Sequence, residues 1–388
     1  MNREGQREKP REKKKKIAYF DYNLLFLIIF LLSFGLVMLY SSSAYISANK
    51  YGDDAYYLKR QLRNIGLGAV MMFIMAKIDY RIWKKFGTLA YFGSFVLCIL
   101  VFMPGIGSSS HGSSRWIDLG PVSFQPSEVA KLGIIIFLAA LIEKVPRQMG
   151  DWKTLAKIFA MTIPLLGIVA YSNLSTAVII FGIIACMLFV ASPKYSHFVI
   201  LGLLGVAFIV FFILFAGYRG SRVKAWLHPE TAGDSGYQTM MGLYAIGSGG
   251  LFGKGLGESL QKLGNVPESQ NDMIFTIICE ELGLFGAICL ILLFVLLIWR
   301  MMVIANNSQD LYGSLLVVGV MAQIAIQAIL NIAVVTNTIP NTGVILPFVS
   351  YGGTSIIFLM AEMGLVLSVS KGIKLESIEN AIEKLTQT

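Results

Sequence analysis

Long apolar runs alternate with short polar segments along nearly the whole chain. Most of these runs are long enough to cross about 30 Å of hydrocarbon as a helix, and the alternating pattern of an outer-membrane barrel is absent. The pattern therefore predicts an all-α fold, a polytopic transmembrane bundle of about ten spans. The predicted spans are 22–40, 62–77, 87–103, 128–142, 156–171, 174–191, 197–216, 273–299, 311–335 and 346–370.

The one long interruption of this pattern runs from Gly217 to Glu281, starting between predicted spans seven and eight. It is rich in glycine and carries charged residues together with aromatic and apolar ones. A rigid bundle can hold such a loop while its backbone approaches a ligand, so we expect a catalytic extracytoplasmic loop at about 217–272. A flexible connector is the alternative, but a connector would rarely carry so many large side chains.

The composition agrees with a membrane protein. Of the 388 residues, 55% are hydrophobic and 14% are charged, and the mean hydropathy is +0.68. The four cysteines lie in apolar runs without a CxxC pair, and the three histidines are scattered, so neither disulfides nor a zinc site are expected. The sequence contains no Walker motif, dinucleotide fingerprint or Ser-His-Asp arrangement.

The distribution of lysine and arginine predicts the orientation. Residues 1–20 form a basic tail, which we expect at the anionic cytoplasmic leaflet of the inner cell membrane. With the N-terminus inside, most of the 32 lysines and arginines fall on the cytoplasmic side of the membrane domain 21–371, and the amphipathic tail 372–388 is cytoplasmic too. Cations that remain outside, such as Arg222, point to an anionic ligand at the outer face. Since the positive charge is a topology signal, nucleic-acid binding is not expected.

The external segment 104–127 leads directly into the fourth predicted span. Glu128 and Lys131 are three residues apart and should share one face of that helix. Such a pair is costly in a membrane unless the two groups satisfy each other or line a polar cavity, so a structural ion pair and a direct role with substrate both remain open. Trp116 is either an interfacial anchor or a platform for a sugar.

Further polar residues lie in the last three predicted spans. Asp272 precedes span eight, and Glu280 and Glu281 lie within it; adjacent helical residues point about 100° apart, so these two cannot both face one groove. For this pair, structural hydrogen bonding competes with a functional role. Prolines and glycines in 337–355 should unwind the outer end of span ten, and Glu362 deeper in that span needs a partner that the sequence does not identify.

The glycine-rich stretch AIGSGGLFGKGLG in the long loop has two interpretations. Successive backbone N–H groups can form an anion nest that would hold a phosphate. A tight interfacial helix and turn that shape the loop is an equally good interpretation, since glycine richness alone is a weak signal.

Several motifs, in the same order, resemble those of the SEDS family, the shape, elongation, division and sporulation proteins typified by FtsW, RodA and SpoVE. The matching segments are RWIDLG, QPSEVAKL, YRGSRVKAWLHP, GYQ, AIGSGGLFGKGLG, PESQNDMIF, EELG and LPFVSYGGTS. The resemblance runs from the first span to the end of the tenth and is closer to the FtsW/SpoVE branch. It implies a ten-span glycosyltransferase of peptidoglycan biosynthesis, which joins lipid II units (disaccharide-pentapeptides on undecaprenyl diphosphate) at the outer face of the cytoplasmic membrane.

The resemblance also implies roles for individual residues. The family's essential aspartate falls on Asp272, its QPSE motif on Glu128 and Lys131, and its RW pair on Arg115 and Trp116. The expected partners are a class B penicillin-binding transpeptidase and the cell-division or sporulation machinery.

One position departs from the family pattern. Asn173 stands in SNLS where family members usually carry an aspartate in a PDLG-like stretch, so we assign it no catalytic role.

Glycosyl transfer from a diphosphate-linked donor needs a base for the acceptor hydroxyl and positive charge for the departing diphosphate. Asp272 is the candidate base; the helix dipole would lower its pKa and a low dielectric would raise it, and the sequence does not decide between them. Mg²⁺ or Mn²⁺ held by Asp272 and the diphosphate is an alternative to the arginines, and no organic cofactor is expected. The predicted substrate-binding residues are Arg115, Trp116, Glu128, Lys131, Arg219, Arg222, Lys254, Glu268 and Ser350.

Two other functions remain as alternatives. A lipid II flippase would have a similar charged cavity, but its polar route should extend to the cytoplasmic side. A non-catalytic scaffold for division or sporulation needs neither the cavity nor the route.

Overall fold

The computed structural model describes residues 20–103, 107–110, 113–118, 123–194, 196, 198–199, 202–203, 205–207 and 217–373. The predicted tails 1–20 and 372–388 and the predicted span 197–216 lie wholly or mostly outside the described residues. Within the described ranges the chain is mainly helical, as the apolar pattern predicts.

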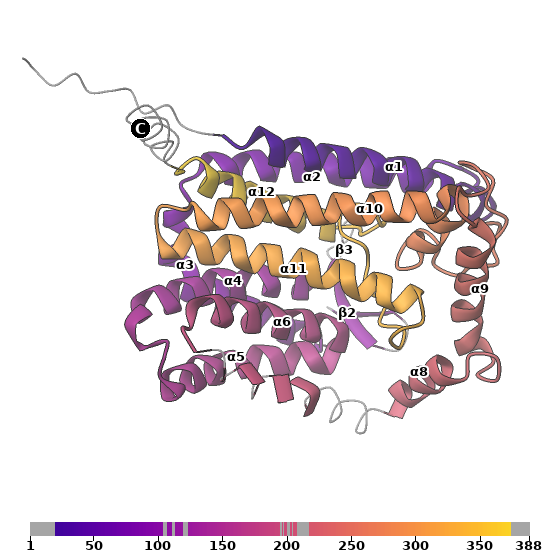
Figure 1. The fold of residues 1–388 in the computed structure, drawn as a ribbon. Coiled ribbons are helices and arrows are strands. Elements are labelled where there is room, and N and C mark those ends of the chain that lie inside the picture. Colours follow the sequence, from indigo (N-terminus) through magenta and orange to yellow (C-terminus); the bar gives the residue numbers. More distant parts are fainter. Residues whose placement is uncertain are drawn as a thin grey trace, which may run out of the picture.

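Helices occupy the other nine predicted spans. They are α1 (Tyr22–Tyr51), α2 (Tyr56–Lys77), α3 (Trp83–Leu100), α4 (Pro126–Lys144), α5 (Trp152–Ser172), α6 (Leu174–Ala191), α10 (Ile274–Asn306), α11 (Leu311–Val335) and α12 (Ser355–Ser370). Five helices among the described residues, α1, α5, α6, α10 and α11, are long and apolar enough to cross a membrane by themselves. The helices lie side by side in one bundle (Figure 1).

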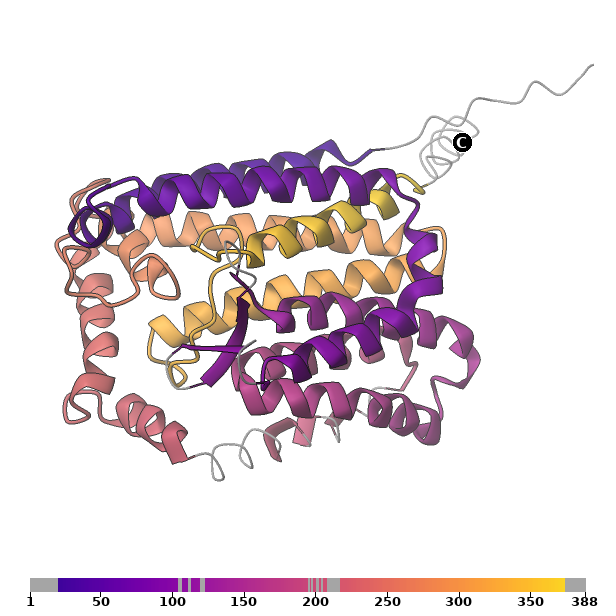
Figure 2. The same cartoon turned by 180° about the vertical axis from the view of Figure 1, so that it is seen from behind.

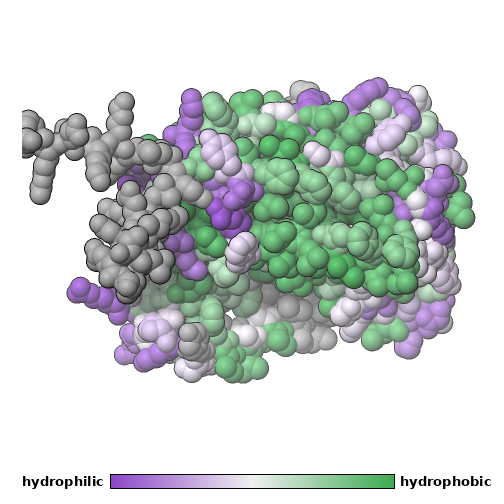
Figure 3. Space-filling model, turned by 45° about the horizontal axis from the view of Figure 1, so that its top comes forward, coloured by the Kyte–Doolittle hydropathy of each residue, from purple (hydrophilic) through white to green (hydrophobic). Residues whose placement is uncertain are grey.

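The flank of the bundle is apolar. Hydrophobic side chains cover its broad middle, and polar side chains collect toward the two ends (Figure 3). Large hydrophobic side chains on α10, such as Phe285, Leu292 and Trp299, are exposed. A surface this apolar is stable when hydrocarbon covers it, so the chain is a multi-pass membrane protein.

Polar side chains define several helix ends. Asp21 accepts a hydrogen bond from Leu24 N at 2.9 Å to cap α1, and Asp310 accepts one from Gly313 N at 2.8 Å to cap α11. Asn173 ends α5 and its Oδ1 caps α6 by accepting from Thr176 N at 3.3 Å. Each cap satisfies an N–H group that the first turn of a helix leaves free.

Helix α11 lies at the centre of the bundle and packs against α4, α6, α10 and α12. α2 packs along α12 and α3 along α4. Small residues permit these close approaches: a Cβ at Gly364 of α12 would lie 2.4 Å from the carbonyl oxygen of Met72 in α2.

The start of α1 and the end of α12 lie at the same end of the bundle (Figure 1). The turns at this end carry many basic residues and include the 3₁₀ turns η1 (Tyr80–Ile82) and η2 (Pro146–Gln148). Ion pairs join them to their neighbours: Arg300 with Asp21 at 2.8 Å, Arg81 with Asp310 at 2.9 Å, and Lys84 with Glu143 at 2.6 Å.

The segment predicted as a long loop contains two helices, α8 (Gly217–Leu227) and α9 (Asp234–Gly249). α9 runs across the opposite end of the bundle, away from the end where α1 begins (Figures 1 and 2). After α9 the chain forms an irregular segment, 250–273, that leads into α10.

The described residues also contain a small sheet, which the all-α prediction did not include. β1 (Gly107–Ser110), β2 (Ser113–Asp118) and β3 (Ser123–Phe124) pair antiparallel in the order β1-β2-β3. Ile117 of β2 is buried, so the face of the sheet that carries its side chain is the one that turns inward.

The predicted unwinding at the start of the tenth span is confirmed. α11 ends at Val335 and α12 begins only at Ser355. The intervening segment folds back from the end of α11 into the middle of the bundle (Figure 2). Irregular backbone at this depth needs internal hydrogen-bond partners, and these form the site described next.

Candidate functional site

Asp272 lies two residues before α10, at the end of the bundle that α9 crosses, and only 8% of its surface is exposed. Its carbonyl oxygen accepts a hydrogen bond from Asn331 Nδ2 of α11 at 2.7 Å. Its carboxylate faces the folded-back segment, since a Cβ at Gly343 would lie 3.9 Å from Asp272 Oδ2. The carboxyl group is therefore a buried group between two irregular segments.

The surroundings of Asp272 raise its pKa to about 7. Burial is the largest cause, because it removes water from the charged form, and the negative charge of Glu268 adds to it. The positive charge of Arg222 acts in the opposite direction. Desolvation thus dominates, which answers the question that the sequence left open.

Arg222 of α8 reaches the folded-back segment. Its Nη1 donates to the carbonyl oxygen of Asn341 at 3.2 Å, and Trp226 Nε1 donates to that of Asn337 at 3.0 Å. α8 is thereby tied to the segment that contains Gly343, and Arg222 acts electrostatically on Asp272. The side chain of Arg219 in the same helix lies outside the described side chains.

Glu268 sits in a strained turn of the segment before α10. Its φ is +55°, in the left-handed region that non-glycine residues seldom adopt, and Asn271 Nδ2 donates to its carboxylate. Nearby, Tyr351 N donates to the carbonyl oxygen of Gln270 at 2.9 Å, a second link between the two irregular segments.

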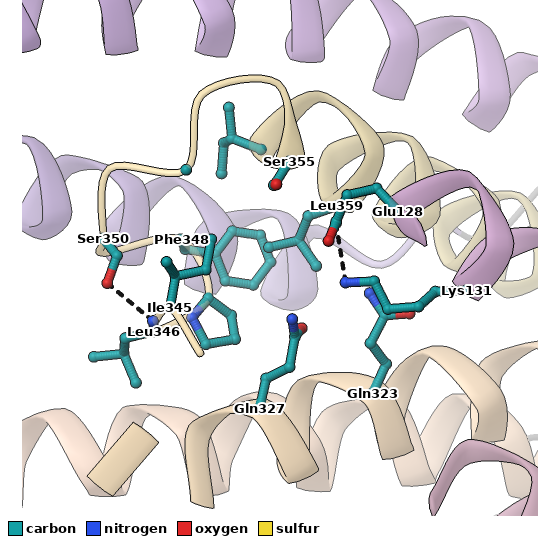
Figure 4. A pocket seen from close by; sticks show the side chains of 13 residues that line it. Glu128, Lys131, Gln323, Gln327, Ile345, Leu346, Phe348, Ser350, Ser355 and Leu359 are labelled. Carbon is teal, nitrogen blue, oxygen red and sulfur yellow. Dashed lines mark hydrogen bonds and ion pairs between the residues drawn. The ribbon is translucent and has the colours of Figure 1, made fainter. Parts of the chain in front are cut away.

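A small cavity with both polar and apolar walls lies between α4, α11, α12 and the folded-back segment (Figure 4). Glu128 and Lys131 of α4 line it and form an ion pair at 2.9 Å, with the Lys131 side chain only 1% exposed. Ser350 lines it too, and its Oγ accepts from Leu346 N at 2.9 Å. Its volume of about 20 Å³ is large enough for one water molecule. The pair is both mutually bonded and cavity-lining, so both of its predicted roles remain open.

A row of amide side chains on α11 was not predicted as part of the site. Gln323, Gln327 and Asn331 are spaced four residues apart and therefore share one helix face. Gln327 and Gln323 line the cavity (Figure 4). Asn331 bonds to the carbonyl oxygen of Asp272. The spacing was a usable signal. Gln323 Nε2 also donates to Glu362 at 2.7 Å, which identifies the partner that Glu362 needs.

The glycine-rich stretch docks on the first part of α10. Lys254 N donates to the carbonyl oxygen of Glu280 and Gly255 N to that of Glu281, each at 2.9 Å. A Cβ at Gly253 would lie 2.1 Å from the Glu281 oxygen, so only glycine permits this approach. Because these N–H groups already donate to carbonyl oxygens of α10, they favour the interfacial helix and turn over the anion nest.

Glu280 and Glu281 point to separate partners, as their angular spacing predicts. Glu280 pairs with Lys254 at 2.6 Å, and Glu281 pairs with Lys262 at 2.7 Å. Ser41 of α1 donates to Glu281 at 2.7 Å. Lys254, predicted to bind substrate, is therefore engaged with a buried carboxylate.

Arg115 and Trp116 are half-buried on β2. Arg115 Nε donates to the carbonyl oxygen of Ser172 at 3.3 Å, so this strand lies beside the turn between α5 and α6. The structure thus places the predicted residues whose side chains are described in four places: Asp272 with Glu268 and Arg222, the cavity with Glu128, Lys131 and Ser350, Lys254 at Glu280, and Arg115 with Trp116 on this strand.

A family model described as a cell cycle protein, which covers FtsW, RodA and SpoVE, matches residues 22–374, nearly the whole chain. The chain belongs to the FtsW/RodA/SpoVE family. Stage V sporulation protein E of Bacillus subtilis is 41% identical over 360 residues, which cover 90% of this chain and 97% of that protein. A probable peptidoglycan glycosyltransferase FtsW of Trichlorobacter lovleyi is 37% identical over 363 residues, 93% of this chain and 95% of that protein.

Solved structures share the fold of this FtsW/RodA/SpoVE protein. One, described as structural coordination of polymerization and crosslinking by a peptidoglycan synthase complex, matches with a TM-score of 0.77 and 27% identity over 92% of this chain and 99% of that one. Thermus thermophilus RodA matches with a TM-score of 0.67 and 27% identity over 91% of this chain and 97% of that one. The family resemblance drawn from the motifs is confirmed.

Among the described residues of this FtsW/RodA/SpoVE protein, no group of three or more His, Cys, Asp or Glu could hold a metal ion. Asp272 and Glu268 supply two carboxylates that influence each other electrostatically. Carboxylate oxygens are hard donors that suit Mg²⁺ or Mn²⁺ when a diphosphate supplies further oxygens. The donor set therefore fits a cation that substrate helps to bind.

Proposed function

We infer that this FtsW/RodA/SpoVE protein is a peptidoglycan glycosyltransferase of cell division or sporulation, and that it polymerises lipid II. The observation that carries the mechanism is Asp272, a buried carboxyl group whose pKa of about 7 suits a base at neutral pH. Asp272 lies at the end of the bundle that α9 crosses, where the charges of Glu268 and Arg222 both act on it. Relatives of the chain that are named peptidoglycan glycosyltransferases support this class of reaction.

We propose ten spans, with both termini in the cytoplasm and the segment 217–272 outside. The basic turns lie at the end where α1 begins and α12 ends, and lysine and arginine favour the cytoplasmic side. Asp272 then lies at the outer face, where lipid II presents its sugars. The tails 1–20 and 372–388 would be cytoplasmic.

In the proposed reaction, Asp272 removes the proton from an acceptor sugar hydroxyl. The acceptor oxygen forms a bond to the anomeric carbon of the donor, and the bond from that carbon to the diphosphate oxygen breaks. The negative charge that develops on the diphosphate is stabilised by Arg222, with Arg219 and Arg115 as further cations. A guanidinium group suits this task because it makes two parallel hydrogen bonds to phosphate oxygens.

Glu128, Lys131 and Ser350 would bind polar groups of the substrate near the cavity, and Trp116 would stack on a sugar. In the alternative to the base role, Asp272 and Glu268 would hold a divalent cation, which would neutralise diphosphate charge when bound. Mn²⁺ binding to the purified protein should then be weak alone and tighter with lipid II present.

We propose that the chain works with a class B penicillin-binding transpeptidase. Support comes from its similarity to a chain of a peptidoglycan synthase complex that coordinates polymerization and crosslinking. Coupling the two activities requires that the polymerase deliver strands to a transpeptidase on the same side of the membrane.

The test is polymerisation of lipid II by the purified protein with its cognate transpeptidase, comparing wild type with Asp272→Ala and Asp272→Asn. Asp53→Ala is the matched control, since Asp53 is a half-buried carboxylate that pairs with Lys59 and accepts from Ala55 N. Glycan strands from wild type and Asp53→Ala, but not from the Asp272 variants, are expected.

Two outcomes would change this interpretation. Strands from Asp272→Ala at the wild-type rate would mean that Asp272 is not the base. No strands from any variant, with an active partner and added Mg²⁺, would favour a flippase, which lipid II transport in vesicles would then detect.

A further inference from the structure

The amide of Asn331 joins the two irregular segments that build the site. Asn331 lies in the last turns of α11 and is fully buried. Its Nδ2 donates to the Asp272 carbonyl oxygen at 2.7 Å and to the Val344 carbonyl oxygen at 2.8 Å. One side chain thus holds the segment before α10 against the segment before α12.

These two bonds set the distance between the carboxyl group and the opposing backbone. Val344 follows Gly343, whose φ of +68° lies in the left-handed region. A Cβ at Gly343 would come within 3.9 Å of Asp272 Oδ2. A shift of Val344 away from Asn331 would therefore change the space in front of the Asp272 carboxylate.

We propose that Asn331 is a positioning residue for glycosyl transfer, because it fixes the Asp272 carboxyl group relative to Gly343. The inference rests on the proposed role of Asp272 as the base. Asparagine suits the position, since its NH₂ group offers two donors and can serve two carbonyl groups at once. A carboxylate has no donor, and a hydroxyl has one. A misplacement of about 1 Å costs roughly 100-fold in rate.

Asn64 of α2 supplies a matched control. It is an asparagine with 5% exposure, and its Nδ2 donates to the Gly353 carbonyl oxygen at 2.8 Å. It therefore holds the same folded-back segment through the same chemistry, at the end next to α12. Its removal tests what a general loosening of this segment does.

The experiment measures lipid II polymerisation by the purified full chain with its cognate transpeptidase, for Asn331→Ala, Asn331→Ser, Asn64→Ala and Asp272→Ala. Initial rates over a range of lipid II concentrations give kcat and KM. Initial rates over a range of pH give the midpoint of the acid limb of the pH–rate profile. Thermal unfolding in detergent reports whether each variant folds.

Asn331→Ala should lower kcat about 10- to 100-fold with KM changed less than about twofold. Its acid limb should move to lower pH, because a loosened site admits water to Asp272 while Glu268 and Arg222 stay in place. Asn331→Ser keeps one donor and should lose less. Asn64→Ala should keep the wild-type midpoint and most of kcat.

Equal losses of kcat and unmoved midpoints in the two alanine variants would make Asn331 a structural residue and overturn the proposal. If Asn331→Ala does not fold, Asn331→Ser decides by the same readouts. If neither folds while Asn64→Ala does, the role is in stability and the proposal is wrong. An active Asp272→Ala overturns the base and the positioning role together; an inactive Asp272→Ala with wild-type kinetics in Asn331→Ala overturns positioning alone.

Discussion

Replacing Gly283 by alanine tests the junction between α10 and the glycine-rich stretch. Gly283 interrupts the helical geometry of α10 with φ +67° and ψ −167°, a conformation that only glycine adopts readily. A Cβ at this position would lie 2.3 Å from Gly253 N and 2.6 Å from the carbonyl carbon of Leu251. Both contacts are with backbone, which cannot rotate away as a flexible side chain would.

The cost of Gly283→Ala has two parts. The unfavourable backbone conformation costs about 1–3 kcal/mol. Relief of the clash would also break two bonds, from Leu284 N to Gly250 O at 2.9 Å and from Phe285 N to Leu251 O at 3.0 Å. Each bond contributes about 0.5–1.5 kcal/mol. The expected loss is therefore on the order of 2–6 kcal/mol.

The assay is thermal unfolding of the purified protein in detergent, with Gly66→Ala of α2 as the control. A Cβ at Gly66 meets open space, and alanine favours helix by about 1 kcal/mol, so the control should melt at or above the wild-type Tm. Gly283→Ala should melt well below both and polymerise less lipid II, because Asp272 lies directly before the start of α10. A Gly283→Ala protein with the wild-type Tm would refute the reasoning.

Three further predictions concern the site. The rate of polymerisation should rise as the pH passes through about 7, because Asp272 must be ionised to act as a base. Glu268→Gln should move the midpoint of this pH–rate profile to lower pH, because it removes a negative charge that raises the pKa of Asp272. An unmoved midpoint would exclude this charge effect. Lys254→Met should lower the free energy of unfolding by about 1–3 kcal/mol, because it deprives Glu280 of its cation, and should leave the KM for lipid II unchanged. A raised KM at an unchanged Tm would show that Lys254 binds substrate. Mn²⁺ binding, followed by electron paramagnetic resonance, should tighten on adding lipid II and be lost in Asp272→Ala; equal binding with and without lipid II would contradict a shared cation site.

The spans could be predicted because each one rests on a local property, an apolar run of sufficient length. The turn at Asn173 and the unwound start of α12 were also local, since a capping residue or a cluster of proline and glycine determines each of them. The docking of the glycine-rich stretch on α10 could not be predicted. It depends on carbonyl groups of Glu280 and Glu281 that become available only where the helix breaks at Gly283.

The residues of the site likewise divide into those that the local sequence identifies and those that only contacts between distant segments reveal. Asp272 was identified because it sits in a family motif, and its position before a span is visible in the sequence. Asn331 was missed, because an amide in an apolar span is usually explained by contacts between helices. Its true partners are the carbonyl groups of Asp272 and Val344, which only the folded-back segment brings together. The pairing of Lys254 with Glu280 was missed for a similar reason, since the two residues are distant in sequence.

Three buried carboxyl groups lie close together in the sequence. Their different surroundings distinguish two structural carboxylates from a candidate catalytic one. Glu280 and Glu281 each have a lysine within 2.7 Å, so the cost of burying their charge is offset. Asp272 instead has a second carboxylate, Glu268, acting on it, and its pKa is raised to about 7. A carboxylate kept only for stability would be paired like the other two. A group that must take a proton at neutral pH and release it again needs the surroundings that Asp272 has.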